Sequence, residues 1–291
     1  MPSPSTPLFR FGVVADPQYA ALGPNLALDR YPAKSLAKLE EAIAEFNRHD
    51  LAFVVTLGDI IDGGWESFDL VLPVYETLRH ARHFLLGNHD FAVAAEHLTK
   101  VANRVGMPSA YYDFAHAGYR FIALDGNEIS LFAPPEGDPR RDDAKALMKA
   151  LHDAGALNPH RWNASVSDAQ YTWLAAKLQD AKAAGEKVIV MNHYPIFPEN
   201  SHNAFDSDSM LALLAEHDHV VAYLSGHNHA GNFGVVDGIY FINFKGMVDT
   251  EDSNAYAIVS VYEDRLEIAG FGREESRVLA LQALNETSGI F

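Results

Sequence analysis

The distribution of apolar positions changes character along the chain, and it predicts an alternation of strands and helices. Residues 9–15, 51–57 and 83–86 are short, nearly continuous apolar runs, which indicate buried strands. Residues 32–47 instead carry apolar side chains at helical spacing, and residues 67–79 are expected to form a second helix. Strand, loop and helix in alternation predict a sheet with crossover connections, and such sheets bind ligands at the carboxyl ends of their strands.

The second half of the chain repeats this alternation and then changes. Residues 187–191 and 220–224 predict buried strands, and residues 167–184 and 207–216 predict helices beside them. The tail alternates apolar runs with Asp-Gly and Glu-Asp turns, so it predicts an antiparallel meander. The remaining expected elements are helices at 91–104 and 142–151, paired strands at 111–114 and 119–124, and tail strands at 234–236, 239–244, 256–262 and 265–271.

Crossover units first and hairpins last predict an α/β fold in which two mixed sheets pack face to face between outer helices. No linker-like run divides the sequence, so we expect one domain over residues 1–291. Residues 126–166 begin with a run rich in proline and glycine. We expect them to form a loop and helix elaboration at the rim of the site.

The composition excludes several kinds of site and partner. Cysteine is absent, which excludes disulfides, thiolate zinc sites and cysteine nucleophiles. The 39 acidic and 22 basic residues give a net charge of −17, and this field repels DNA and RNA backbones. We therefore expect no nucleic-acid polymer as a partner. A small phosphorylated substrate stays compatible with this charge, because bound divalent cations reverse the sign locally.

Neither a membrane nor secretion is indicated by the sequence. No apolar run approaches the roughly 18 residues that a transmembrane helix needs. The first residues lack a basic segment followed by an apolar one, so no secretory signal is visible. We expect no membrane association and a cytoplasmic location, and the sequence leaves the oligomeric state open.

Five clusters of polar residues follow predicted strands, and they carry side chains that bind divalent metals. The clusters are Asp16-Pro17-Gln18, Gly58-Asp59, Gly87-Asn88-His89-Asp90, Asn192-His193 and Gly226-His227-Asn228-His229. Oxygen and imidazole ligands hold the metals that hydrolyse phosphate esters, and a pair of metals about 3.5–4 Å apart clamps the reacting oxygens. The candidate ligands are Asp16, Gln18, Asp59, Asn88, His193, His227 and His229.

Each of these residues also has an ordinary structural interpretation. Asp59 could cap the following helix, Asn88 could be a turn residue, and His193 could be one hydrogen-bonded histidine among the chain's 14. The spacing of His227 and His229 recurs elsewhere in the chain, so it proves little by itself. The order of the five clusters carries the prediction.

This ordered series resembles the motifs of the calcineurin-like metallophosphoesterases. A closer resemblance is to the manganese-dependent ADP-ribose/CDP-alcohol diphosphatase branch, in which Gln18 replaces the usual histidine of the first motif. The matching residues include Asp16-x-Gln18, Arg30-Tyr31, Gly58-Asp59-Ile60-Ile61-Asp62, Gly87-Asn88-His89-Asp90, Trp162-Asn163, His193, Gly226-His227-Asn228-His229 and Lys245-Gly246-Met247-Val248-Asp249-Thr250.

The resemblance implies a four-layer sandwich, a metal-dependent phosphohydrolase and a role for each motif. One metal would be held by Asp16, Gln18, Asp59 and His229, and the other by Asp59, Asn88, His193 and His227. A metal-bound hydroxide would attack the phosphorus. His89 would stabilise the transition state or protonate the leaving oxygen, and either Asp62 or Asp90 would orient it.

Two divalent metal ions are the expected cofactors. The ligand set favours Mn²⁺, because Gln18 and Asn88 supply neutral oxygens and no sulfur is available. Imidazole would also hold iron or zinc. Metal affinity should fall as the histidines protonate below about pH 6.5.

The resemblance implies cleavage of the diphosphate bond of ADP-ribose, CDP-alcohols or related nucleoside diphosphate compounds. Arg30, Asn163 and Lys245 are the expected substrate contacts, although Arg30 and Lys245 could equally be ordinary exposed charges. The sequence departs from the branch at Ala164-Ser165 and across residues 198–206, and Lys245 stands where an acidic residue is expected. A cyclic-nucleotide phosphodiesterase or a phosphomonoesterase on the same fold therefore stays an alternative, and a non-catalytic metal-binding scaffold is another.

Overall fold

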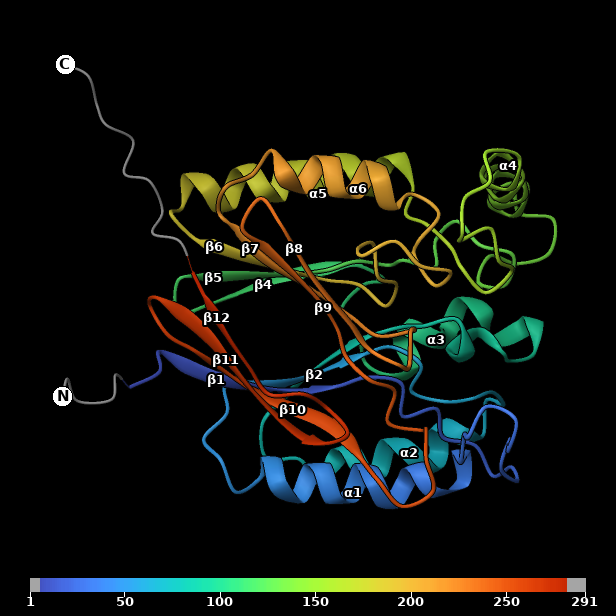
Figure 1. The fold of residues 1–291 in the computed structure, drawn as a ribbon. Helices are drawn as coiled ribbons and strands as arrows, with labels where there is room; N and C mark the ends of the chain where they lie inside the picture. Colours follow the sequence, from blue (N-terminus) through green and yellow to red (C-terminus); the bar gives the residue numbers. More distant parts are fainter. Residues whose placement is uncertain (1–5, 282–291) are drawn as a thin grey trace.

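Two mixed sheets pack face to face in this computed structural model, which describes residues 6–281 (Figure 1). Within those residues each sheet has six strands. Helices cover both outer faces, which gives the four layers that the family resemblance implies (Figure 1). The predicted α/β class is confirmed.

The first sheet is built on the three parallel strands that the apolar runs predict. β1, β2 and β3 lie side by side in chain order, and every residue of β2 is buried. Three antiparallel strands from the end of the chain extend the sheet beyond β1. Its order is β12 (Arg277–Ala280), β11 (Arg265–Gly272), β10 (Ala255–Val261), β1 (Phe9–Val14), β2 (Phe53–Leu57) and β3 (Ala81–Leu85).

The second sheet has four parallel strands in its centre and an antiparallel strand at each edge. The parallel strands β5, β6, β7 and β9 run the same way as one another, and every residue of β7 is buried. The order is β4 (Tyr112–His116), β5 (Tyr119–Ala123), β6 (Lys187–Met191), β7 (Val220–Ser225), β9 (Ile239–Asn243) and β8 (Asn232–Val236).

The predicted antiparallel pairing of the tail strands is confirmed for β8 with β9 and for β10 with β11, but these hairpins do not form one continuous meander, because they belong to different sheets. β8 and β9 form a hairpin, but β9 then pairs in parallel with β7. β10 instead pairs with β1 in the first sheet. Residues 244–254 therefore cross from one sheet to the other, and we call them the crossing segment. β12 was not predicted at all.

Helices that each bury one face form the two outer layers. α1 (Ser35–Phe46) and α2 (Ser67–Glu76) cover the first sheet, and α5 (Asp168–Ala183) and α6 (Ser207–Ala215) cover the second (Figure 1). α5 begins where predicted, since the Ser167 side chain accepts a hydrogen bond from the backbone N–H of Gln170. Among the described residues, every helix is too short or too polar to cross a bilayer.

The helix predicted over residues 91–104 is broken into shorter pieces. Short 3-10 helices occupy His89–Phe91 and Ala95–Lys100, and only α3 (Val101–Arg104) is α-helical. The chain leaves helical geometry at Ala92 and Ala94, whose ψ angles are 52° and 149°. Just before this break, the Asp90 carboxylate accepts the backbone N–H groups of Ile60, Ile61 and Gly87. α4 (Arg140–Asp153) packs beside the end of the sandwich through Ala144 (Figure 1).

Aliphatic side chains and aromatic rings fill the space between the sheets. Phe11 stacks on Phe53 with ring centroids 5.1 Å apart, and Phe53 meets Phe121 of the facing sheet edge-on at 4.9 Å. Burying one such ring stabilises the fold by roughly 1.5–3 kcal/mol relative to an exposed ring. This packing fixes the position of one sheet relative to the other, so the loops at their common end also have fixed positions.

Candidate metal centre

The seven predicted ligands meet at one end of the sandwich, across both sheets. The loops after β1, β2 and β3 contribute Asp16, Gln18, Asp59 and Asn88, and the loops after β6 and β7 contribute His193, His227 and His229. The carboxyl ends of parallel strands share an edge, which explains why clusters distant in sequence become neighbours.

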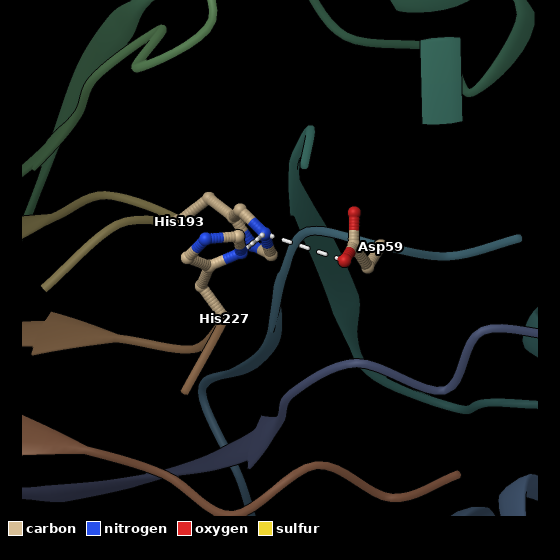
Figure 2. Close-up of side chains that lie close together, drawn as sticks. All are labelled: Asp59, His193 and His227. Atoms are coloured by element: carbon tan, nitrogen blue, oxygen red, sulfur yellow. Dashed lines mark hydrogen bonds and ion pairs between the residues drawn. The ribbon is translucent and has the colours of Figure 1, made fainter. Parts of the chain in front are cut away.

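Within residues 6–281, two groups of acidic and imidazole side chains are close enough to hold a cation, and Asp59 belongs to both. In the first group, His193 Nε2 lies 3.4 Å from Asp59 Oδ2 and 3.2 Å from His227 Nδ1 (Figure 2). In the second group, His229 Nε2 lies 3.7 Å from Asp16 Oδ1. A shared carboxylate between two groups is the arrangement that a pair of metal ions requires.

A neutral side-chain amide lies beside each group: Gln18 beside the group with His229, and Asn88 beside the group with His193. Gln18 Nε2 lies 2.9 Å from Asp59 Oδ2 and 3.1 Å from His229 Nε2, while Gln18 Oε1 is buried without a hydrogen-bond partner. A half-turn of the amide would place this oxygen among the same neighbours. Asn88 Oδ1 lies 3.3 Å from His193 Nε2. A buried acceptor without a donor is a group that a cation would satisfy.

Two imidazoles are anchored through the ring nitrogen that faces away from the centre. His193 Nδ1 donates to the carbonyl oxygen of Leu57 at 2.8 Å, and His227 Nε2 donates to Asn163 Oδ1 at 2.9 Å. The Asn163 amide is fixed because its Nδ2 donates to two backbone carbonyls. These contacts leave His193 Nε2 and His227 Nδ1 facing each other, and His193 Nε2 also faces Asp59.

The third imidazole is anchored in the same way by a carboxylate. His229 Nδ1 lies 2.7 Å from Asp249 Oδ1, so His229 Nε2 faces Gln18 and Asp16. Asp249 lies in the crossing segment. All three outer contacts suit imidazoles that act as metal ligands, because a hydrogen bond from one ring nitrogen fixes the tautomer that presents the other.

The side chains of the centre balance their charges through shifted pKa values. Burial opposes ionisation of Asp59, but the charges of His193 and His89 hold its pKa well below the usual range. Burial likewise opposes protonation of His193, but Asp59 raises its pKa to about 9. Burial lowers the pKa of His227 well below its usual value and raises the pKa of Asp16. A cation that displaced the His193 proton would satisfy the same carboxylate.

His89 stands beside the centre without belonging to either group. Its backbone N–H donates to Asp59 Oδ1 at 2.8 Å, and its Nδ1 lies 2.7 Å from Asp62 Oδ1. The structure therefore pairs His89 with Asp62 and not with Asp90, since within residues 6–281 Asp90 accepts hydrogen bonds from backbone N–H groups alone. Burial lowers the pKa of His89, but Asp59 and Asp62 offset this and raise it to about 9.

Four of the candidate ligands have left-handed backbone. The φ angles are 49° at Asp16, 44° at Gln18, 52° at Asp59 and 67° at His227. Such a conformation costs about 1–3 kcal/mol for a residue other than glycine and persists only where its surroundings enforce it. These strained residues lie just after the ends of strands, and their backbone conformation turns the side chains towards one point.

Gly87 lets two chain segments approach the centre closely. A Cβ at this position would overlap the Asp59 carboxylate and lie within 2.6 Å of His193 Nε2. A side chain larger than hydrogen would push apart two candidate ligands.

Replacing Gly87 by alanine is expected to weaken binding of divalent cations and to lower stability by about 1–3 kcal/mol, because the new methyl group overpacks the centre. Calorimetric Mn²⁺ titration and thermal denaturation measure the two effects. Gly23→Ala is the matched control, since its Cβ would meet nothing within 4 Å. Unchanged Mn²⁺ affinity in Gly87→Ala would contradict the assigned packing.

A pocket of about 390 Å³ opens over the centre, a size that suits a small molecule. Its outer wall includes Trp162, which is 43% exposed and stacks on His160 with ring centroids 4.4 Å apart. The lining residues are Gln18, Leu28, Arg30, Asp59, Asn88, His89, Trp162, His202, His227 and His229.

The three predicted substrate contacts lie in different places. Arg30 lines the pocket. Asn163 is fully buried behind His227, and Lys245 lies outside the pocket lining with its ammonium 3.4 Å from Glu275. Sequence reasoning missed Leu28 and His202, which belong to no motif. It also missed Asp249, although this residue lies inside one of the matching motifs.

Comparison with known proteins finds similar chains. The sequence profile of the calcineurin-like phosphoesterase family matches residues 9–231. A manganese-dependent ADP-ribose/CDP-alcohol diphosphatase of Homo sapiens is 30% identical, over 94% of this chain and 92% of its own. The protein of that name from Arabidopsis thaliana is 29% identical, over 93% of this chain and 96% of its own. The structure of a dimetal phosphatase from Danio rerio superposes with a TM-score of 0.84 at 26% identity, over 95% of this chain and 100% of that chain.

Proposed function

Because the chain belongs to the calcineurin-like phosphoesterase family, we propose that it hydrolyses the diphosphate bond of ADP-ribose, CDP-alcohols or related nucleoside diphosphate compounds. The observation that carries the proposal is the pair of buried ligand groups that share Asp59 beside a pocket of small-molecule size. The names of the relatives in Homo sapiens and Arabidopsis thaliana support the choice of substrate.

The donor set fits two divalent cations. Its oxygen and imidazole atoms favour Mn²⁺, and the orphaned oxygen of Gln18 offers the acceptor that such an ion needs. Two bound cations lower the pKa of a water molecule and neutralise the oxygens of a phosphoryl group. The residues proposed to hold one ion are Asp16, Gln18, Asp59 and His229, and those proposed for the other are Asp59, Asn88, His193 and His227.

We assign roles to four further pocket residues from their positions. His89 lines the pocket and pairs with Asp62, so it is placed to donate a proton to the leaving oxygen. Arg30 contacts the phosphate that is not attacked, since a guanidinium pairs well with phosphate oxygens. Leu28 and Trp162 provide the apolar surface for the part of the substrate beyond the phosphates.

A substrate panel tests the proposal. We expect ADP-ribose and CDP-choline to be hydrolysed with Mn²⁺ at a kcat/KM at least about tenfold above that of 2′,3′-cyclic AMP or a phosphomonoester, equivalent to ~1.4 kcal/mol of transition-state binding. Arg30→Gln should reduce this preference, because it removes the contact to the second phosphate. Arg48→Gln is the matched control, since Arg48 lies just beyond the end of α1, is exposed and pairs with Glu45. A clear preference for the monoester or the cyclic nucleotide would reject the diphosphatase assignment.

A further inference from the structure

The crossing segment passes directly beside the ligand group of Asp16, Asp59 and His229. It leaves β9 in the second sheet and enters β10 in the first, and Val248 N donates to the carbonyl oxygen of Asp16 at 3.1 Å. Its backbone pairs with the loop that precedes α1, since Tyr31 N donates to Val248 O at 3.0 Å and Thr250 N donates to Asp29 O at 2.7 Å. Arg30 lies between these two contacts.

One oxygen atom of the crossing segment touches both the centre and the pocket. Asp249 Oδ1 lies 2.7 Å from His229 Nδ1 and 3.6 Å from Arg30 Nε. The side chain of Asp249 is 18% exposed and that of Arg30 is 23% exposed, so solvent reaches this contact only in part. A candidate metal ligand and the pocket arginine therefore share a single carboxylate.

The backbone of Asp249 is held by a buried lysine. Lys38 reaches across from α1, and its Nζ donates to the carbonyl oxygens of Met247 at 3.0 Å, Asp249 at 2.7 Å and Thr250 at 2.6 Å. Lys38 is only 6% exposed, and no carboxylate lies within 4.0 Å of its ammonium among residues 6–281. An ammonium group has three protons, and here all three are used on one short stretch of backbone.

An arginine holds the same stretch from the other side. Arg273 follows β11, and its Nη2 donates to the carbonyl oxygens of Gly246 and Asp249, the latter at 3.2 Å. The Lys38 ammonium and the Arg273 guanidinium thus both donate to the backbone carbonyl of Asp249, from two different parts of the fold. Such a fixed backbone leaves the Asp249 carboxylate little freedom, which is what a group that orients other side chains needs.

We propose that Asp249 is a positioning residue that orients His229 towards one cation and Arg30 towards the substrate phosphate, with Lys38 and Arg273 holding it in place. The inference rests on the proposed function for its metal and its substrate. One carboxylate thereby has two effects. Its 2.7 Å contact sets the tautomer of His229, and its 3.6 Å contact sets the direction of the Arg30 side chain.

The first experiment is a calorimetric titration of the full chain with Mn²⁺. Asp249→Ala should weaken one of two Mn²⁺ sites by roughly 10–100-fold and leave the other unchanged. Asn163→Ala should weaken the opposite site, because Asn163 anchors His227. The double variant should lose both. Glu251→Gln is the control in the same segment, since Glu251 is exposed and pairs with Lys34, and this variant should bind Mn²⁺ as the wild type does.

Kinetics with ADP-ribose supply the second readout. Asp249→Ala should raise KM for the diphosphate more than for a phosphomonoester, because Arg30 loses its partner, and Asp249→Asn should give an intermediate result. Lys38→Met should reproduce the selective loss at one Mn²⁺ site, and Lys38→Arg should restore part of it. If Lys38→Met does not fold, the Asp249 variants alone decide the proposal.

Three outcomes overturn the inference. Equal weakening of both Mn²⁺ sites in Asp249→Ala, or no weakening of either, removes the positioning role while leaving the proposed function intact. A wild-type chain that binds no Mn²⁺ refutes the proposed function, and the inference with it. Because the titration contains no substrate, an error in the substrate assignment leaves its result unchanged.

Discussion

Replacing Asp59 by alanine is expected to reduce Mn²⁺-dependent hydrolysis of ADP-ribose to the background rate. Asp59 belongs to both candidate ligand groups, so its loss affects both cations at once. One of its oxygens accepts from Gln18 and faces His193, and the other accepts from the backbone N–H of His89. No neighbouring carboxylate reaches both groups within the described residues, so compensation is not expected.

The rate is measured with saturating Mn²⁺, after circular dichroism has shown that the variant is folded. Asp59→Asn serves as a second variant, because it keeps the shape of the side chain and removes only the charge. Asp153→Ala, at an exposed carboxylate on α4, controls for a general loss of acidity. A near-wild-type rate in either Asp59 variant would contradict the proposal that Asp59 is a ligand of both cations.

Replacing His89 by alanine should lower kcat by roughly 10²–10⁴-fold, the usual contribution of a general acid. The effect should be smaller for substrates with an acidic leaving group, because these need less help from a proton donor. Mn²⁺ affinity should change little, since the His89 ring belongs to neither ligand group. A variant that loses Mn²⁺ and activity together would show that His89 acts through the centre instead.

The pH dependence gives an independent check on His89. Its pKa of about 9 means that the ring is protonated at neutral pH and loses its proton as the pH rises through that value. Activity should therefore fall on the alkaline side, and this fall should be absent in His89→Ala. Asp62→Asn removes a carboxylate that raises the pKa of His89, so it should move the fall to lower pH. An unchanged profile in Asp62→Asn would contradict the pairing.

The sequence alone was sufficient to place the candidate ligands together, for a physical reason. Asp16, Asp59 and His193 each follow an apolar run that forms a parallel strand, and parallel strands end at a common edge. Periodicity of apolar residues also predicted the α/β class and most of the elements. These features depend on local pattern, which a sequence displays directly.

The features that sequence reasoning missed depend on distant contacts. The choice between Asp62 and Asp90 rests on which carboxylate the fold turns towards His89, although Asp90 is its neighbour in sequence. Asp249 and Asn163 are hydrogen-bonded to His229 and His227, which lie on a different loop of the chain. The division of the tail between two sheets depends on which strand edges are free, and alternation of apolar and polar residues is the same in either sheet.

The position of the centre across both sheets also bears on the timing of its assembly during biosynthesis. Gln18 and His229 lie 3.1 Å apart although 211 residues separate them in the chain. Synthesis proceeds from the amino terminus, so the acidic ligands of the first sheet leave the ribosome long before the imidazoles of the second. The crossing segment that anchors His229 comes later still. Each ligand group is therefore complete only after the second half of the chain has been made and has packed against the first.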